Sequence, residues 1–457
     1  MVVLTKRDTM KNIQQDHLRE LFSTALTAVD PYRAVIRACR FENNVLTAGG
    51  GVYDLNVFDR VLVVGAGKAT ASMAAAVEDV LGNRIELGIV VVKYGHRGNL
   101  TTIEQVEAAH PVPDEAGVQG TQRILELVRR ADEKTLVICL LSGGGSALLV
   151  APLPAITLDD KQRTTDLLLK AGATIEDLNA VRKHLSAVKG GRLAQIAHPA
   201  TVVTLVLSDV IGDRLDVIAS GPTASDSSTY SDALQVIERY RLKAEFPQPV
   251  IKFLERGMAG QEPETARSAD ACFLRTSNVI VGSSAQALAA AREKAAALGW
   301  RPEVVTAELQ GEARDAARLL ARKAMAARDE MKQGERRCLL FGGETTVSVH
   351  GTGKGGRNQE LALAFALEIK EIDGITLLSA GTDGTDGPTD AAGAVVEGSV
   401  VPVARNLGIH PEIYLGNNDS YAFFHELDSH TGEKHHVLTG PTGTNVMDLQ
   451  IVLIEAL

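Results

Sequence analysis

Glycine-rich loops follow four of the short apolar runs in this 457-residue chain, and this arrangement constrains the fold most. GAGKAT follows RVLVV, SGGGSA follows TLVICLL, SDVIGD follows TVVTLVL, and GTDGTDGPTD follows ITLLSA. Helical patterns separate the runs, and apolar strands that alternate with helices indicate a parallel sheet covered on both faces. Ligands of such sheets bind beyond the carboxyl ends of the strands. A tight turn explains one such loop, but four together indicate a binding site.

The alternation of strands and helices divides the chain into two expected domains. Periodicity is weak from about residue 241 to residue 271, and we place a hinge there. We predict a Rossmann-like, parallel-sheet domain over residues 1–260 and a second α/β domain over residues 261–457, which begins with the strand NVIVG. The segment TTVSVHG alternates polar and apolar residues, so it predicts an antiparallel edge strand in a mixed second sheet.

Composition excludes several classes of protein. The net charge of −10 disfavours nucleic acids and anionic membranes as partners. The four cysteines are far apart and form no CxxC pair, which excludes a compact cysteine-type zinc site. The N-terminus lacks a signal-peptide pattern, and no apolar run reaches the roughly 18–20 residues that cross a bilayer. We expect a soluble cytoplasmic protein.

The glycine loops fit none of three common motifs. GAGKAT and GTGKGG break the Walker rule GxxxxGK[ST], because Ala69 and Gly355 follow their lysines. A dinucleotide site is weakly supported, since Thr70 replaces the third glycine and the next strand ends at Lys93-Tyr94 without an acid for the ribose. GGSAL lacks the final glycine of a hydrolase nucleophile elbow.

Cations at predicted helix starts give a better indication of the ligand. Lys68 and Arg357 each stand in the first turn of a predicted helix, where the helix already carries about half a positive charge. Glycine-loop N–H groups, a helix N-terminus and a cation together form a phosphate or carboxylate site. The alternative for each residue is a solvated surface side chain.

A third group of cations lies in NAVRKHLSAVKGGRLAQ, residues 179–195, and includes Lys189 before a pair of glycines. The usual meaning of such a charge run is a solvated helix face. Its local enrichment in an acidic chain also suits anion binding. His110, in AHPVPDE, either lines the site or stiffens the turn before Pro111, and we favour the turn.

Carboxylates near a phosphate site can hold Mg²⁺ or accept a proton from a hydroxyl nucleophile. Asp209 directly follows a buried strand and has no turn glycine after it, so we rank it first as the base. Asp383 and Asp386 precede glycines and are candidates for Mg²⁺, although Asp-Gly pairs are also ordinary turn formers.

Eight of these stretches, in order, resemble the class II glycerate 2-kinases, a MOFRL-type family sometimes labelled as hydroxypyruvate reductases. The matching segments are VVGAGKA, HPVPDEAG, LLSGGGSALL, NAVRKHLSAVKGGRLA, SDVIGDRLDVIASGPT, GGETTVSVHGTGKGGRNQELAL, SAGTDGTDGPTDAAGA and LTGPTGTNV. The resemblance implies ATP-dependent phosphorylation of D-glycerate at its 2-hydroxyl, with Mg²⁺, in a cleft between a Rossmann-like domain and a domain that carries the MOFRL segment. Lys68, Asp209 and Arg357 match the family's catalytic positions.

On this reading Asp209 accepts the hydroxyl proton, while Lys68 and Arg357 neutralise the phosphoryl group and the carboxylate. The expected partner is a small-molecule substrate, with no nucleic acid or membrane, and a homodimer is a candidate assembly. The rival functions are an NAD(P)H-dependent hydroxypyruvate reductase and a non-catalytic sugar-phosphate-binding protein. The expected substrate- and ATP-binding residues are Gly65, Gly67, Ser142, Gly143, Gly144, Gly145, Ser146, Lys189, Glu344 and Asn358.

Overall fold

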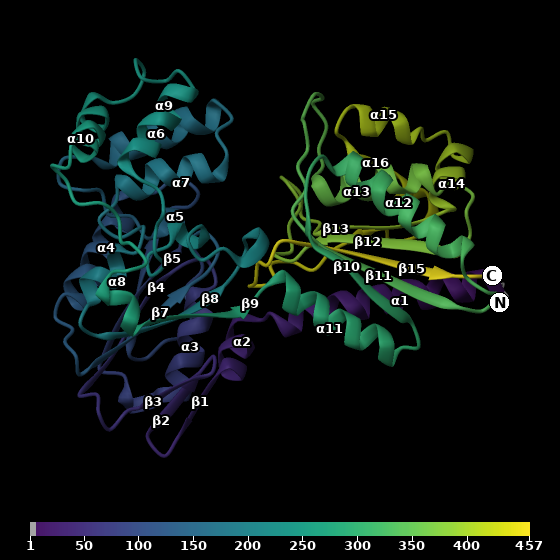
Figure 1. Ribbon diagram of the computed structural model, residues 1–457. Helices are drawn as coiled ribbons and strands as arrows, with labels where there is room; N and C mark the ends of the chain where they lie inside the picture. The colour runs from purple at the N-terminus through teal and green to yellow at the C-terminus, as the bar shows by residue number, and fades with distance from the viewer. Residues whose placement is uncertain (1–5) are drawn as a thin grey trace. The chain divides into compact units, whose positions relative to one another are not determined.

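The computed structural model describes residues 6–457, and of residues 6–12 it describes only a helical backbone (Figure 1). The chain forms two compact units. The N-terminal unit is Pro31–Val281. The C-terminal unit is Gly282–Leu457 together with the segment that ends at Asp30.

A six-stranded sheet of order β6-β5-β4-β7-β8-β9 forms the centre of the N-terminal unit. The neighbours from β6 to β8 pair in parallel. Counted from its first strand, the order is 3-2-1-4-5-6, that of the Rossmann fold, so the predicted fold class of this unit is confirmed. The strands are β4 (Arg60–Ala66), β5 (Leu87–Lys93), β6 (Ile103–Ala108), β7 (Thr135–Leu141), β8 (Thr201–Leu207) and β9 (Thr276–Gly282).

Helices cover this sheet and bury its apolar side chains. α3 (Thr70–Leu81) and α4 (Glu115–Val128) both contact β5. Every residue of β7 is buried, which explains its unbroken apolar sequence. The shorter elements of the unit are α2 (Pro31–Ala38), η1 (Gly82–Arg84), α5 (Gly145–Leu148), α8 (Arg192–Ala197), η2 (Ile211–Asp213), η3 (Ile218–Ser220) and η4 (Ala271–Arg275).

Two parts of the N-terminal unit were not predicted. One is an antiparallel sheet of β1 (Cys39–Glu42), β2 (Val45–Ala48) and β3 (Gly51–Asp54). The other is a helical layer around the buried ring of Tyr230, seen at the upper left of Figure 1. Its helices are α6 (Leu158–Lys170), α7 (Ile175–His184), α9 (Tyr230–Arg239) and α10 (Gln248–Met258).

The expected hinge at residues 241–271 therefore contains a packed helix. Pro249 stands in the first turn of α10, where proline is tolerated, so it begins a helix and does not interrupt one. The division of the chain also differs from the predicted boundary after residue 260. β9 joins the N-terminal sheet, and α1 (Lys6–Ala28) packs on α11 (Ser284–Ala297) of the C-terminal unit. The apolar pattern of β9 predicts a strand, but it does not indicate which of the two sheets the strand joins.

The C-terminal unit has a mixed sheet of order β10-β11-β15-β12-β13-β14. β10 and β11 are parallel, and the other pairings are antiparallel. The predicted mixed sheet is confirmed, but TTVSVHG is not its antiparallel strand, because Thr346 makes only an isolated bridge to Glu312. The strands are β10 (Arg301–Leu309), β11 (Arg336–Gly343), β12 (Ile375–Gly381), β13 (Gly393–Glu397), β14 (His436–Val437) and β15 (Asp448–Glu455).

Two layers of helices enclose this second sheet. Figure 1 shows α1 and α11 on one face and α12 and α13 on the other. The polar segment that should form an edge strand instead runs from β11 to α13. The helices not yet given are α12 (Ala313–Asp329), α13 (Arg357–Glu368), α14 (Val400–Asn406), α15 (Pro411–Gly416) and α16 (Ser420–Thr431).

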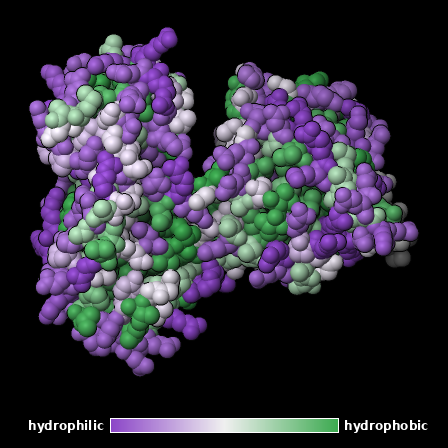
Figure 2. All heavy atoms as spheres, viewed as in Figure 1, coloured by the Kyte–Doolittle hydropathy of each residue, from purple (hydrophilic) through white to green (hydrophobic). Residues whose placement is uncertain are grey.

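On the face shown in Figure 2, hydrophilic residues cover most of each unit, with hydrophobic patches among them. Among residues 6–457, no helix combines the length and the apolar character that a bilayer crossing needs.

Candidate functional site

Two loops meet where the strand order of the N-terminal sheet reverses, between β4 and β7. Lys68 N donates to the carbonyl of Gly143 at 2.9 Å. Ala69 N donates to Ser142 Oγ at 3.1 Å, and the hydroxyls of Ser142 and Thr70 are also 3.1 Å apart. This reversal is the position at which sheets of this order bind ligands. The sequence therefore predicted correctly that GAGK and SGGGS belong to one place.

Glycine is required where these loops touch. Gly67 has a φ of +149°, and a Cβ there would lie 2.0 Å from Ser142 Oγ. A Cβ on Gly65 would lie 2.2 Å from the carbonyl oxygen of Leu140. Gly65 and Gly67 thus permit close contact between neighbouring chain segments. These close contacts explain both glycines without a ligand.

The SGGGS loop presents unpaired backbone donors. Ser142 N and Gly145 N bond to carbonyls within the two loops. In the described part of the chain, the N–H groups of Gly143, Gly144 and Ser146 have no acceptor. Three free N–H groups in one short loop beside a cation suit an anion such as a phosphate.

Asp209 lies against this loop. A Cβ on Gly143 would be 2.4 Å from Asp209 Oδ2, so only glycine allows the carboxylate so near the loop. Burial raises the pKa of Asp209, while the charge of Lys68 opposes that rise. Among the described residues, Lys68 makes no ion pair with a carboxylate. The structure thus brings together a raised-pKa carboxylate, an unpaired ammonium and free N–H groups.

His110 is a residue of this site that the sequence analysis assigned to a turn. A Cβ on Gly144 would lie 3.0 Å from His110 Cδ2 and 3.2 Å from Lys68 Cγ. Burial, together with the charges of Lys68, Lys93 and His96, lowers the pKa of His110 to about 4. The imidazole is therefore neutral near pH 7. Its position after β6, at the same end of the sheet as the glycine loops, was the available signal.

Lys189 does not lie where a ligand-binding lysine was expected. Its side chain is 1% exposed, and its ammonium donates to the carbonyls of Ser146, at 2.8 Å, and Ala219, at 3.3 Å. Lys189 thus holds the SGGGS loop from behind. Ser146 Oγ lies 2.9 Å from Ser220 Oγ. Ala219 and Ser220 both have positive φ, a strained conformation that clusters at functional sites.

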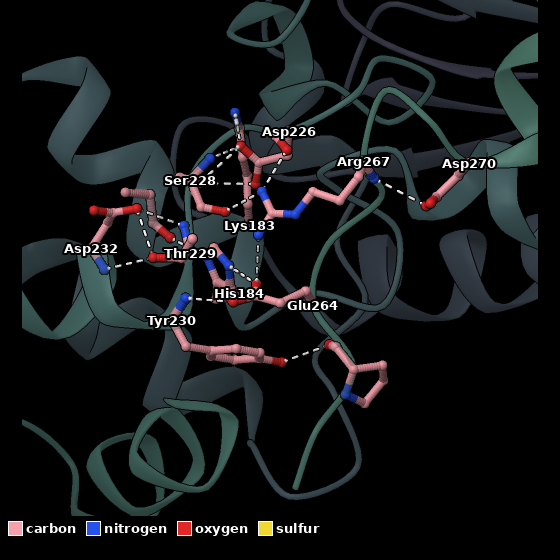
Figure 3. A network of polar contacts seen from close by, with 12 residues as sticks. Lys183, His184, Asp226, Ser228, Thr229, Tyr230, Asp232, Glu264, Arg267 and Asp270 are labelled. Atoms are coloured by element: carbon pink, nitrogen blue, oxygen red, sulfur yellow. Dashed lines mark hydrogen bonds and ion pairs between the residues drawn. The ribbon is translucent and has the colours of Figure 1, made fainter. Parts of the chain in front are cut away.

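Most of the basic run at residues 179–195 is buried, so it is not a solvated helix face. Figure 3 shows Lys183 beside Asp226, with 3.1 Å between Nζ and Oδ1. It also shows His184 beside Glu264, with Nε2 3.0 Å from a carboxylate oxygen. These pairs tie α7 to the segments around it. Lys183 and His184 therefore belong to a network of ion pairs and hydrogen bonds that stabilises the fold.

In the C-terminal unit, Arg357 is bound by the protein's own carboxylates. Its Nε and Nη2 lie 2.6 and 2.9 Å from the two oxygens of Asp448, and Nη1 lies 2.8 Å from Glu344 Oε1. β15 is antiparallel to β11 and β12, so Asp448 at its start lies beside their ends. The cation at the start of α13 therefore has an internal anion, although its position at a helix start predicted a bound ligand.

Contacts within the protein also explain the glycines of the loop before α13. The N–H groups of His350 and Gly351 both donate to Asn418 Oδ1, and Lys354 N donates to Asp419 Oδ1. A Cβ on Gly353 would lie 2.3 Å from Asp419 Cβ. These glycines let the loop approach the segment before α16, and the donors named here are not available to a phosphate.

Asn358 and Asp386 form the N-terminal cap of α13. Asp386 accepts hydrogen bonds from the N–H groups of Asn358, at 3.0 Å, and Gln359, at 2.9 Å, and also from their side-chain amides. Asn358 is 1% exposed, and its Oδ1 accepts from Ser379 Oγ. Burial raises the pKa of Asp386 to about 6, although the two backbone bonds oppose the rise. Both residues thus stabilise the start of α13, where the carboxylate of Asp386 accepts from N–H groups that have no acceptor within the helix.

The two metal candidates differ in fit. Asp386 has both oxygens occupied by N–H donors, so it does not fit a Mg²⁺ ligand. Asp383 is half-buried, and Oδ1 accepts from Thr385 within a turn, while Oδ2 has no donor among the described residues. Residues 6–457 contain no group of three or more His, Cys, Asp or Glu side chains arranged for a metal. Mg²⁺ in kinases commonly needs only one or two carboxylates besides substrate phosphates, so Asp383 fits the ion.

Comparisons with known proteins show which family the chain belongs to. Residues 17–255 match a domain of unknown function, DUF4147, and residues 337–448 match the MOFRL family. A D-glycerate 2-kinase of Thermotoga maritima is 46% identical over 405 residues, which cover 87% of this chain and 91% of that protein. The chain belongs to the glycerate 2-kinase family.

Other relatives of this family carry two kinds of name. A crystal structure of a glycerate kinase (EC 2.7.1.31) from Thermotoga maritima has a TM-score of 0.84 and 43% identity, and the match covers 97% of this chain and all of that one. A putative hydroxypyruvate reductase of Agrobacterium vitis is 44% identical over 400 residues, or 86% of this chain and 99% of that protein.

Proposed function

We propose that this chain phosphorylates D-glycerate at the 2-hydroxyl with ATP, giving 2-phosphoglycerate and ADP. One observation carries the proposal: Lys68, Asp209 and the unpaired N–H groups of the SGGGS loop converge at the switch point of the Rossmann-like sheet. The similarity to a D-glycerate 2-kinase over most of both chains supports the same reaction.

The roles follow from what phosphoryl transfer requires, namely positioning and neutralisation of charge. Asp209 accepts the proton of the attacking hydroxyl, and its raised pKa makes it a stronger base than an ordinary aspartate. Lys68 and the N–H groups of the SGGGS loop bind the transferring phosphoryl group. His110, being neutral, serves as a hydrogen-bonding group in this site.

The C-terminal unit supplies the second set of groups to the proposed reaction. Arg357 provides a cation whose orientation Asp448 fixes through two bonds. Asp383 would hold Mg²⁺, which supplies neutralisation of phosphate charge when it is bound. The four cysteines are buried and unpaired, in keeping with a reducing, cytoplasmic location.

Phosphorus NMR of the purified protein with ATP, Mg²⁺ and D-glycerate tests the proposal. A 2-phosphoglycerate signal that grows together with ADP is the expected result. Oxidation of NADH on addition of hydroxypyruvate, without phosphoryl transfer, would instead favour the reductase. The sequence gives the reductase little support, because β5 ends at Lys93 and the next residue is Tyr94, not the acidic residue that binds a ribose in dinucleotide sites. Binding of D-glycerate with neither reaction would favour the non-catalytic alternative.

A further inference from the structure

Three cations beside the site have no carboxylate partner. They are Lys161 on α6, Arg182 on α7 and Lys189 after α7, and none forms an ion pair with any described residue. Lys161 is 7% exposed and donates to the carbonyl of Leu185 at 3.3 Å. Lys189 is 1% exposed and donates only to carbonyls. We name these three residues the cation cluster.

The guanidinium of Arg182 has N–H donors that bond to nothing in the described chain. Its Nε is 3.5 Å from Thr165 Oγ1, at the limit of a hydrogen bond. Its two terminal nitrogens have no acceptor among residues 6–457, although the side chain is half-buried. Lys183 and His184, which follow it on the same helix, are both paired with acids (Figure 3). The fold thus supplies carboxylates to the neighbours of Arg182 and none to Arg182 itself.

Several contacts place the cation cluster next to the proposed kinase site. Lys189 bonds to Ser146 of the SGGGS loop. Gln162, adjacent to Lys161, donates to the carbonyl of Pro113 at 2.7 Å, in the turn that carries His110. Asn179 lies about one helical turn before Arg182, and its Oδ1 accepts from Ser220 Oγ, which pairs with Ser146.

Asn179 supplies a second sign of a missing partner. The residue is 3% exposed, and its amide Nδ2 has no hydrogen-bond acceptor in the described chain. A buried donor without an acceptor is uncommon in folded proteins, and a bound ligand is one explanation for it. An unsatisfied amide and an unpaired arginine therefore lie on one stretch of α7.

Like charges buried together without a counterion disfavour folding, so such groups lose protons or bind an anion. Burial, with the charge of Arg182, lowers the pKa of Lys161 to about 7. Burial and the charges of Lys161 and Arg182 lower the pKa of Lys189 well below its usual range. Burial lowers the pKa of Arg182 to about 10, so it stays charged near neutral pH. Arg182 therefore supplies one lasting positive charge, which suits a single carboxylate.

We propose that the cation cluster is the subsite for the carboxylate of the acceptor substrate, with Arg182 as the contacting group. This inference rests on the proposed function. The planar guanidinium offers two parallel N–H donors to a carboxylate, a geometry that lysine cannot reproduce. The acceptor hydroxyl is on the carbon next to the carboxylate, so a carboxylate held by Arg182 fixes the position of that hydroxyl.

Steady-state kinetics of Arg182→Ala and Arg182→Lys test the proposal. We expect Arg182→Ala to raise the KM for D-glycerate at least tenfold and to leave the KM for ATP within twofold. Arg182→Lys should fall between Arg182→Ala and the wild type. Arg163→Ala is the matched control, because Arg163 is an exposed arginine on α6 that donates only to the carbonyl of Glu245. It should leave both constants unchanged.

An unchanged KM for D-glycerate in Arg182→Ala would overturn the proposal, and so would a rise in the KM for ATP alone. Calorimetric titration of D-glycerate, with uncharged glycerol as the comparison, separates this inference from the proposed function. If the wild type binds D-glycerate without phosphorylating it and Arg182→Lys weakens that binding, the proposed function fails and the subsite stands. If Arg182→Lys binds D-glycerate as tightly as the wild type does, the subsite assignment is wrong whatever the reaction.

Discussion

Arg357 and Asp448 are joined by two hydrogen bonds, with Nε 2.6 Å from Oδ2 and Nη2 2.9 Å from Oδ1. Arg357 is the first residue of α13, and Asp448, which is fully buried, is the first residue of β15. The pair therefore ties the helix start to the middle of the sheet. Burial alone would lower the pKa of Arg357, but the bonds and charge of Asp448 and the charge of Glu344 outweigh burial and raise it. The guanidinium is a permanent, fixed cation.

Replacing Arg357 should therefore affect both turnover and stability. Arg357→Ala leaves Asp448 as an uncompensated buried charge, and we expect it to lower the free energy of unfolding by about 3 kcal/mol. We also expect at least a hundredfold loss of kcat, since the fixed cation is removed. Urea unfolding and steady-state kinetics measure the two effects.

Arg357→Lys separates these effects, because it keeps a charge beside Asp448 and loses the two-bond geometry. It should recover most of the stability and little of the turnover. Near-normal kcat in Arg357→Ala would remove Arg357 from the reaction and leave it a purely structural role.

Asp209→Asn should lower turnover strongly without harming the fold. Loss of a general base costs about 10²–10⁴ in kcat. Because the folded pKa of Asp209 is raised, its ionised form disfavours folding, and that cost grows as pH rises from the unfolded pKa through the folded one. The neutral asparagine removes the cost, so the Tm at pH 7 should be equal to or above that of the wild type. For the wild type, the acid limb of kcat should lie above the ordinary aspartate range.

A wild-type kcat that stays constant down to pH 4 would contradict the assignment of Asp209 as the base. An asparagine variant with normal turnover would do so as well. Asp213, in the same segment after β8, offers a control, and Asp213→Asn should retain kcat within a few-fold.

The strand and glycine-loop pattern predicted the N-terminal sheet and the meeting of GAGK with SGGGS, because parallel strands place their carboxyl ends at one edge. It could not predict that Lys189 turns inward, since burial of a lysine depends on carbonyls contributed by Ser146 and Ala219. It also misassigned the loop before α13. A glycine that approaches a neighbouring segment and a glycine that approaches a phosphate have the same sequence signature.

The carboxylates show the same limit. Asp386 precedes a glycine in the sequence, and only the fold brings it to the N-terminus of α13, 28 residues earlier in the chain. Asp209 was ranked first for a local reason, its position directly after a buried strand, and its role as the base stays a prediction. Properties set within one strand and its loop were predictable, whereas partners supplied by distant segments were not.

The pKa of His110 reports on the charge of Lys68. Burial is the largest cause of its lowered value of about 4, and Lys68 is the next. Lys68→Met keeps the side-chain length and removes the charge, so the pKa of His110 should rise while remaining below 6.5. The proton NMR signals of the imidazole, followed from pH 7 to pH 4, measure it.

The control for this titration is Lys134→Met, since Lys134 is exposed and pairs with Asp59 before β4. It should leave the pKa of His110 unchanged. An equal pKa in wild type and Lys68→Met would show that Lys68 is too far from His110 to share a site with it.

The two aspartates of GTDGTDGPTD should respond differently to substitution. Asp386→Asn removes an acceptor from buried donors at the start of α13, and we expect it to lower the free energy of unfolding by about 1–3 kcal/mol. Asp383→Asn should change stability by less than about 0.5 kcal/mol. It should instead raise the Mg²⁺ concentration that gives half-maximal kcat, because Asp383 retains an oxygen without a donor. Titration of kcat with Mg²⁺ measures the metal requirement of both variants, and urea unfolding measures their stability. A shifted Mg²⁺ requirement in Asp386→Asn, with a normal one in Asp383→Asn, would reverse the assignment and make the cap of α13 part of the metal site.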